Sequence, residues 1–158
     1  MNIGSWMIWG FAATVVMTTI LVAAQYLRLT RMSLPYLLGM LVTGDRDKAK
    51  VMGVFFHLLN GWAFSLMYVA AFHAWGGPAW WKGALIGLVQ SLFILGVILP
   101  VMPGMHPRMA SEHGGPTIAR QLEPPGFLAL HYGVQTPVAV VIAHLAFGII
   151  LGIFYKPY

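Results

Sequence analysis

Two histidines begin the same short pattern in two distant parts of the chain. The segment "HLLNGWAFSLMY" runs from His57 to Tyr68, and "HLAFGIILGIFY" runs from His144 to Tyr155. In both, a glycine follows the histidine by four residues, a small residue by eight and a tyrosine by eleven. Neutral imidazoles ligate haem iron or other metals, exchange protons, or join helices through hydrogen bonds. The pattern leaves a haem or metal site, a proton or substrate role, and simple packing open for His57 and His144.

A second group of potential ligands lies in "MPGMHPRMASEH", residues 102–113. Thioether and imidazole groups suit Cu(I). Five such side chains fall within this segment: Met102, Met105, His106, Met109 and His113. Because prolines interrupt the segment, no regular helix is expected to set their spacing. The alternative to a copper site is a loop whose methionines pack at a membrane interface.

The same loop carries a few charged residues that have two further uses. Arg108, Glu112, Arg120 and Glu123 can pair with one another, or can bind an anionic headgroup or a partner protein. Glutamate and histidine together also meet a minimal requirement for acid–base catalysis. The chain has no nucleophile motif, phosphate-binding loop or His-Glu-x-x-His motif to accompany them. The sequence therefore favours a protein that is not an enzyme.

The composition indicates that these residues sit in a membrane protein. Of 158 residues, 59% are hydrophobic and 8% are charged, whereas soluble domains contain about 25% charged residues. The absence of cysteine excludes disulfides and thiolate metal sites. The net charge of +5 comes from residues that flank apolar runs, which disfavours a nucleic-acid partner. We expect the lipid bilayer as the main surrounding and other membrane subunits, or further copies of the chain, as partners.

Four apolar runs are long enough to cross a bilayer, which requires roughly 20 helical residues. They are Ile3–Leu29, Val51–Phe72, Trp80–Leu99 and Pro137–Tyr155. Thr136 and Pro137 are typical of an N-cap and a first helical turn. The sequence thus predicts an all-α membrane protein with four transmembrane helices in a single domain over residues 1–158.

The positive charges predict which way these helices cross the membrane. Seven lysines and arginines lie in the first and third loops, and two lie on the opposite side, at Lys82 and Lys156. Positive residues favour the cytoplasmic side. We therefore expect a multi-pass protein of the bacterial inner membrane with both termini outside. The first loop and the long third loop, about residues 101–136, would face the cytoplasm.

A second matching pair of segments suggests an internal duplication. "LPYLLGM" (Leu34–Met40) follows the first apolar run, and "LPVMPGM" (Leu99–Met105) follows the third. Each half then reads helix, Leu-Pro-x-x-x-Gly-Met, loop and histidine helix. We predict two helical hairpin repeats, about residues 3–75 and 76–158, related by a pseudo-twofold axis along the membrane normal.

The small residues predict close helix contacts along the histidine faces. At 100° per residue, each histidine shares an arc of about 80° with its glycine, small residue and tyrosine. Small residues four apart let helix backbones approach closely. The expected packing positions on these faces are Gly61, Ser65, Gly148 and Gly152, and Gly83 and Gly87 form another such pair in the third apolar run. Asn60 and Gln90 are expected to be buried polar residues. Equal depth would allow the two histidines to meet near the axis.

Four segments carry a resemblance to known proteins: "ATVVMT", "FHLLNGWAFSLMY", "KGALIGLVQSLFILGVILPVMPGM" and "AHLAFGIILGIFY". Together they resemble a bacterial family of small four-helix membrane proteins that is catalogued only as a domain of unknown function. The stretch from His106 to Gly126 departs from the short third loop of that family. The resemblance implies the four-helix topology and carries no activity.

Three functions remain as hypotheses from the sequence. The first is a non-enzymatic accessory, assembly or scaffold subunit that acts through helix packing and the long loop. The second is a haem- or metal-binding redox protein centred on His57 and His144. The third is a transporter of small solutes or lipid-like molecules, although no Asp, Glu, Lys or Arg lies well inside the expected spans to couple it to ions.

Overall fold

The computed structural model describes residues 1–111 and 113–158, and the regular structure within them is helical. Four helical stretches of this described part are long and apolar enough to cross a membrane, in agreement with the sequence. The elements are α1 (Ile3–Tyr26), α2 (Leu34–Gly39), α3 (Arg46–Ala74), α4 (Trp80–Phe93), the π-helix η1 (Ile94–Ile98), α5 (Leu99–Met105), the 3₁₀-helix η2 (Phe127–Tyr132) and α6 (Thr136–Phe154).

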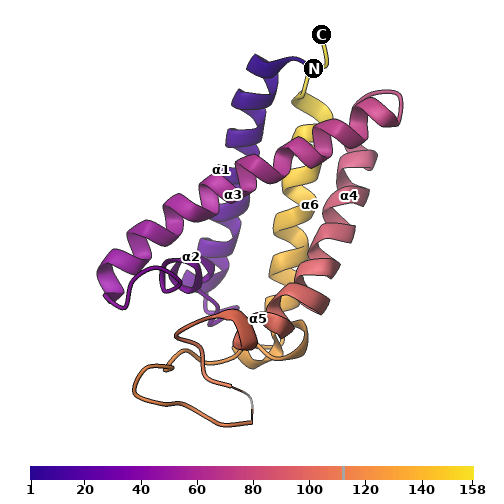
Figure 1. Ribbon diagram of the computed structural model, residues 1–158. Helices are drawn as coiled ribbons and strands as arrows, with labels where there is room; N and C mark the ends of the chain where they lie inside the picture. Colours follow the sequence, from indigo (N-terminus) through magenta and orange to yellow (C-terminus); the bar gives the residue numbers. More distant parts are fainter. Residues whose placement is uncertain (112) are drawn as a thin grey trace.

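The spanning helices are not arranged as a closed bundle. In Figure 1, α3 crosses obliquely in front of α1 and α6, while α4 lies along α6. α6 packs extensively on α4 and on α1, and α3 packs on α1, but α3 and α4 barely touch. Both termini lie at one end of the molecule, and α2, α5 and the long loop lie at the other (Figure 1). At the terminal end, the Asn2 amide donates to the Tyr158 carbonyl over 3.1 Å.

The third spanning helix is longer than the sequence predicts. We expected it to end near Leu99 because Pro100 and Pro103 follow, but it continues through both prolines to Met105. Proline lacks an N–H donor, and the π-helical turn of η1 directly before Pro100 changes the usual i−4 bonding pattern. The helix thus continues past the prolines without ending. The loop that was predicted from about residue 101 begins at His106 instead.

α6 begins one residue earlier than predicted. Thr136 is its first residue, Gln135 occupies the N-cap position, and Pro137 lies in the first turn. The Thr136 hydroxyl does not cap the helix. It lies 2.6 Å from the Thr30 hydroxyl, both groups being buried, and so ties the start of α6 to the segment after α1.

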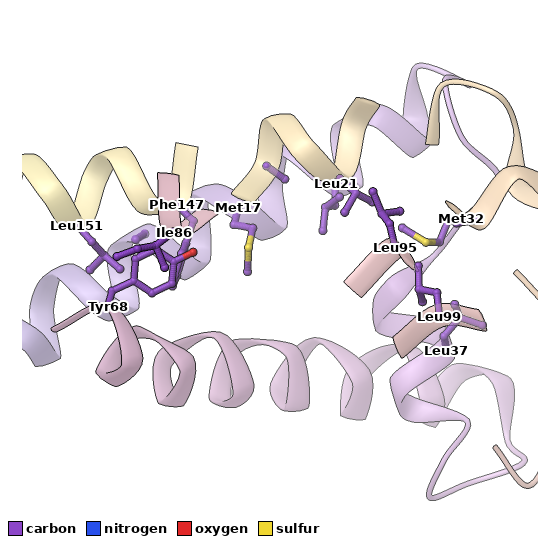
Figure 2. Close-up of a cluster of buried hydrophobic side chains, with 14 of the residues drawn as sticks. Met17, Leu21, Met32, Leu37, Tyr68, Ile86, Leu95, Leu99, Phe147 and Leu151 are labelled. Atoms are coloured by element: carbon purple, nitrogen blue, oxygen red, sulfur yellow. The ribbon is translucent and has the colours of Figure 1, made fainter. Parts of the chain in front are cut away.

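Large apolar side chains fill the interior along the bundle as one cluster (Figure 2). Toward one end of it lie Tyr68 of α3, Ile86 of α4 and Phe147 of α6. Toward the other, near the loop end, lie Leu21, Met32, Leu37, Leu95 and Leu99. The outer surface is also apolar, with exposed side chains such as Ile8, Phe55 and Val89. An apolar surface on both sides of the helices is compatible with contact to a lipid bilayer.

Candidate functional site

The glycines of α4 and α6 lie where the two helix backbones touch. A methyl group on Gly83 would fall inside the contact radius of the Gly148 carbonyl oxygen, and one on Gly87 would collide with the His144 carbonyl. A methyl group on Gly152 would meet the backbone of Ala79. Backbone atoms cannot rotate away, so this contact requires residues without side chains.

The corresponding small residues of α3 face side chains of α1. A methyl group on Gly61 would meet the side chain of Thr14. The Ser65 hydroxyl oxygen accepts the indole N–H of Trp6 over 2.7 Å. These small residues belong to the stripe His57, Gly61, Ser65 and Tyr68 along α3, the counterpart of the stripe His144, Gly148, Gly152 and Tyr155 along α6. They therefore pack against α1 through side chains and a hydrogen bond.

The hydrogen bonds of His57 determine which of its ring nitrogens carries hydrogen. Its Nδ1 lies 2.9 Å from the Thr18 hydroxyl oxygen, and the Thr18 hydroxyl donates its only hydrogen to the Thr14 carbonyl over 2.7 Å. The Nδ1–H of His57 must therefore be the donor to Thr18. In the neutral ring this leaves Nε2 with a lone pair and no hydrogen.

His144 reaches the same protonation pattern by another route. Its Nδ1 lies 2.8 Å from the carbonyl oxygen of Val140, one turn earlier in α6. Because a carbonyl can only accept, the Nδ1–H of His144 is the donor. Both histidines are buried, with 6% and 4% of their surface exposed, and both carry an unprotonated Nε2.

Both Nε2 atoms border open space. Within the described residues, neither Nε2 has a hydrogen-bond partner, and the one enclosed side-chain polar atom without a partner is the indole nitrogen of Trp62. Each Nε2 is therefore in contact with open space. The space beside both rings is a cavity of about 230 Å³ that His57 and His144 line together.

This cavity is apolar apart from four residues. Its walls come from each spanning helix and from α2. The polar residues on it are His57 and Asn60 of α3, Gln90 of α4 and His144 of α6. Three methionines also line it: Met17, Met32 and Met102. The structure thus brings the two predicted histidines and both predicted buried polar residues to one cavity.

The cavity is half-enclosed, and its open side lies between α3 and α4. The lining residues with large exposed surfaces are Phe64 of α3, Phe93 of α4 and Ile98 of η1. These are the helices that barely touch each other. Asn60 is also exposed, so the structure does not bury it as the sequence predicts. The opening faces the apolar surface of the molecule at the depth of the spanning helices.

The amide oxygen of Gln90 already accepts a hydrogen bond within the protein. Its Oε1 accepts the hydroxyl of Tyr68 over 2.6 Å. Tyr68 is fully buried and its ring packs edge-on against Phe147 at a centroid distance of 5.1 Å. The side of Gln90 left for other contacts is its NH₂ group, which can only donate.

The predicted copper ligands do not gather around one point. His106 uses both ring nitrogens, because Nε2 donates to the Leu37 carbonyl over 3.0 Å and Nδ1 accepts the Arg108 amide over 3.1 Å. Met109 is buried, while Met105 is 79% exposed and His113 is exposed. Met102 belongs to the cavity. No group of three or more His, Asp or Glu residues able to hold a metal is found among the described residues.

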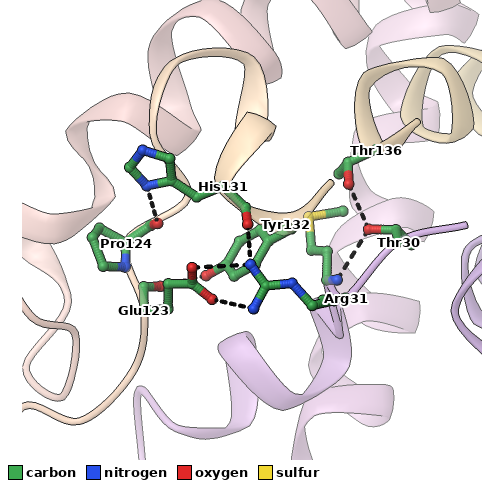
Figure 3. Close-up of polar contacts among 8 residues, drawn as sticks. Thr30, Arg31, Glu123, Pro124, His131, Tyr132 and Thr136 are labelled. Atoms are coloured by element: carbon green, nitrogen blue, oxygen red, sulfur yellow. Dashed lines mark hydrogen bonds and ion pairs between the residues drawn. The ribbon is translucent and has the colours of Figure 1, made fainter. Parts of the chain in front are cut away.

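Glu123 of the long loop and Arg31, which follows α1, form a clamp that the sequence did not reveal (Figure 3). Arg31 forms an ion pair with Glu123 at 2.9 Å and also donates to the His131 carbonyl. The Tyr132 hydroxyl donates to the Glu123 carbonyl, and His131 donates to the Pro124 carbonyl over 2.9 Å. Burial, together with the Glu123 carboxylate, raises the pKa of the Tyr132 hydroxyl well above its usual range, against the opposing effect of Arg31. Glu112 lies outside the described residues.

A comparison with known protein families found no match, and no curated protein or solved structure matches the chain either. The resemblance to small four-helix membrane proteins therefore stays a prediction from the sequence.

Proposed function

We propose that this protein binds a small membrane-soluble molecule in the cavity between α3 and α4 and acts as a binding protein or carrier. The observation that carries the proposal is the cavity itself, which has apolar walls, two accessible imidazole nitrogens and an open side between spanning helices. Ligand sites are typically apolar pockets with a few converging polar groups.

The position of the opening supports entry from the lipid. Apart from Asn60, its rim consists of apolar side chains of α3, α4 and η1 that lie on the outer surface. A molecule dissolved in the hydrocarbon would reach the cavity sideways, without crossing the polar ends of the helices. This supports the lipid-like branch of the transport hypothesis over a path for ions or polar solutes.

The size of the cavity favours a compact head on the ligand. A cavity of roughly 150 Å³ is enough to hold benzene, and this one measures about 230 Å³. It has room for one substituted ring, whereas the fused macrocycle of haem is several rings wide. The haem branch of the redox hypothesis therefore receives no support from the cavity, and metal analysis of the purified protein tests the remaining metal branch.

The hypothesis of an accessory or scaffold subunit gains less support from the same geometry. Gly83, Gly87, Gly148 and Gly152, which the sequence suggested for helix packing, are used in the contact of α4 with α6 inside the chain. The outer faces carry bulky apolar side chains that suit lipid. We place the protein in the bacterial inner membrane with the long loop at the cytoplasmic side, on the distribution of positive charge.

A pair of matched variants tests the binding proposal. Ile98 lines the opening and is 40% exposed, and its neighbour Val97 is 44% exposed but does not line the cavity. Ile98→Trp should block the opening, whereas Val97→Trp should add the same bulk toward lipid. The native protein, reconstituted in lipid nanodiscs, is extracted and its bound small molecules are identified by mass spectrometry. We expect a molecule that is retained by Val97→Trp and lost from Ile98→Trp; equal retention by both variants would contradict the proposal.

A further inference from the structure

We infer that the ligand carries an uncharged aromatic head with hydroxyl groups, as a membrane quinol does, and that Nε2 of His57 and Nε2 of His144 accept its hydroxyl hydrogens. This inference rests on the proposed function of the cavity. It goes further by stating the chemical class of the ligand and the role of each histidine.

The available hydrogen bonds of the two histidines point in one direction only. Both Nδ1–H groups are committed to protein acceptors, so each histidine offers only a lone pair to the cavity. An acceptor in an apolar space without a donor is unfavourable, because its interactions with water are lost and not replaced. The complementary ligand is one that brings two hydrogen-bond donors, and hydroxyl groups are donors that an apolar molecule can carry through a membrane.

The cavity has no formally charged side chain in the part of its lining that the structure describes. No Asp, Glu, Lys or Arg is among the described residues that line the cavity. A carboxylate ligand would place an acceptor against two acceptors, with no cation beside it. A bound cation would lack a compensating negative charge. An uncharged hydroxyl group avoids both penalties.

The shape of the cavity and the position of its open side suit a ring that carries an apolar tail. The volume of about 230 Å³ admits one substituted ring. Phe64, Phe93 and Ile98 form an apolar rim at the opening, where an alkyl or isoprenoid tail can pass out into the lipid. A flat ring with hydroxyl groups and a long apolar tail combines these requirements.

The reduced and oxidised forms of such a ligand offer different hydrogen-bonding groups to the histidines. Oxidation of a quinol to the quinone removes both hydroxyl hydrogens and leaves two acceptors on the ring. Those oxygens cannot form hydrogen bonds with the Nε2 atoms of His57 and His144, because both partners are acceptors. The NH₂ groups of Gln90 and Asn60 can donate to a ring oxygen in either form, so they do not reverse the preference for the quinol. The site should therefore prefer the quinol.

The test uses a quinol and quinone pair with the same ring and a decyl tail, titrated anaerobically into the protein in nanodiscs. Binding is followed by quenching of tryptophan fluorescence. The quinol should bind about tenfold more tightly than the quinone, because only the quinol supplies hydrogen-bond donors to the two Nε2 atoms. Equal or tighter binding of the quinone would overturn the inference.

Two double variants assign the preference to the histidines. Asparagine places an amide near the Nδ1 position, so His57→Asn with His144→Asn retains donors to Thr18 and Val140 but loses the acceptors at Nε2. Glutamine reaches the Nε2 position, so His57→Gln with His144→Gln retains an oxygen that can accept. We expect the quinol preference to disappear in the asparagine variant and to survive in part in the glutamine variant. A preference that persists in a folded asparagine variant would overturn the role of the histidines.

The same titration separates this inference from the proposed function. If quinol and quinone bind equally and Ile98→Trp blocks both, the cavity binds ligands but does not select hydroxyl groups, and only the inference fails. If neither probe binds to the native protein and no molecule copurifies with it, the proposed function fails as well. The melting temperature of each variant confirms that the compared proteins are folded.

Discussion

The helices α3 and α6 carry the same spacing of histidine, glycine, small residue and tyrosine, yet they pack against different kinds of neighbour. On α6, Gly148 and Gly152 touch the backbone of α4. On α3, Gly61 faces the side chain of Thr14 and Ser65 accepts a hydrogen bond from Trp6. The spacing determines which residues share a helix face, but the partner helix determines whether that face meets backbone or side chains.

The two histidines show the same contrast. His57 donates to a hydroxyl group on another helix, while His144 donates to a carbonyl of its own helix. Both arrangements leave Nε2 unprotonated. The contact of α4 with α6 is a close backbone seam, whereas α3 meets α1 through side chains and remains apart from α4 along the opening of the cavity.

The largest expected effect comes from breaking the backbone seam of α6 with Gly83→Ala. The added methyl group collides with the Gly148 carbonyl, and neither backbone can move without separating the helices. Overpacking typically destabilises by about 1–3 kcal/mol and occasionally by more, and we expect this variant at the upper end. Unfolding in mixed micelles, followed by tryptophan fluorescence, measures the loss.

Gly96→Ala is the control for this variant. Gly96 lies in η1 of the same spanning helix, and a methyl group there meets no neighbouring atom within 4 Å. It should leave the free energy of unfolding nearly unchanged. Equal destabilisation by Gly83→Ala and Gly96→Ala would show that the backbone contact is not what holds α4 to α6.

Gly61→Ala should have a smaller effect, because the methyl group meets a side chain that can adjust. The nearest atom is Cγ2 of Thr14, whose hydroxyl also donates to the Gly10 carbonyl over 2.7 Å. We expect a loss of about 1–2 kcal/mol. Thr14→Ser removes Cγ2 and keeps the hydroxyl, so the double variant should recover part of that loss in the same unfolding experiment. A loss as large as that of Gly83→Ala, without recovery, would erase the contrast between the helices.

The sequence was sufficient to predict the spanning helices, because length and apolar composition alone determine that property. It also placed the glycines on the histidine faces through helical periodicity. It could not predict the continuation of the third span through Pro100 and Pro103, since the π-helical turn that accommodates the prolines has no sequence signal of its own. Nor could it predict that the methionines and histidines of residues 102–113 lie apart from one another. Their positions depend on contacts with α2, such as that of His106 with Leu37.

The candidate site was predictable in its residues but not in its chemistry. Repetition singled out His57 and His144, yet their shared protonation pattern depends on Thr18 and Val140, which no spacing rule identifies. The clamp of Arg31 with Glu123 joins residues 92 positions apart, and single charges in two loops do not indicate that they will meet. Periodicity describes one helix at a time, whereas these features arise between elements.

Thr18→Val sharpens the contrast between the two histidines. Valine has nearly the shape of threonine but cannot accept the Nδ1–H of His57. Hydrogen bonds between helices in a membrane contribute about 0.6 kcal/mol on average, with a maximum of about 1.7 kcal/mol, and we expect a loss of about 1 kcal/mol. In ¹⁵N spectra of histidine-labelled protein, the signals of His57 should change and those of His144 should not, because its acceptor is the backbone of α6. Changes in the signals of both rings would show that the environment of His144 depends on the hydrogen bond of His57, and would contradict the contrast between them.

The smallest expected effects come from the tyrosines that end the two stripes. Tyr68→Phe removes the buried hydrogen bond to Gln90 and leaves the amide oxygen without that donor, so we expect a loss of about 0.6 kcal/mol. Tyr155→Phe removes a 3.0 Å contact with His73, which is exposed near the terminal end, where water can replace the lost partner. Its effect should be only about 0.3 kcal/mol, below that average for membrane hydrogen bonds. The unfolding free energies of the two variants, measured in parallel, decide the order. If Tyr155→Phe proves the more damaging, the stripe of α6 depends on its terminal tyrosine as well as on its glycines, and the contrast with α3 is weaker than the backbone contacts suggest.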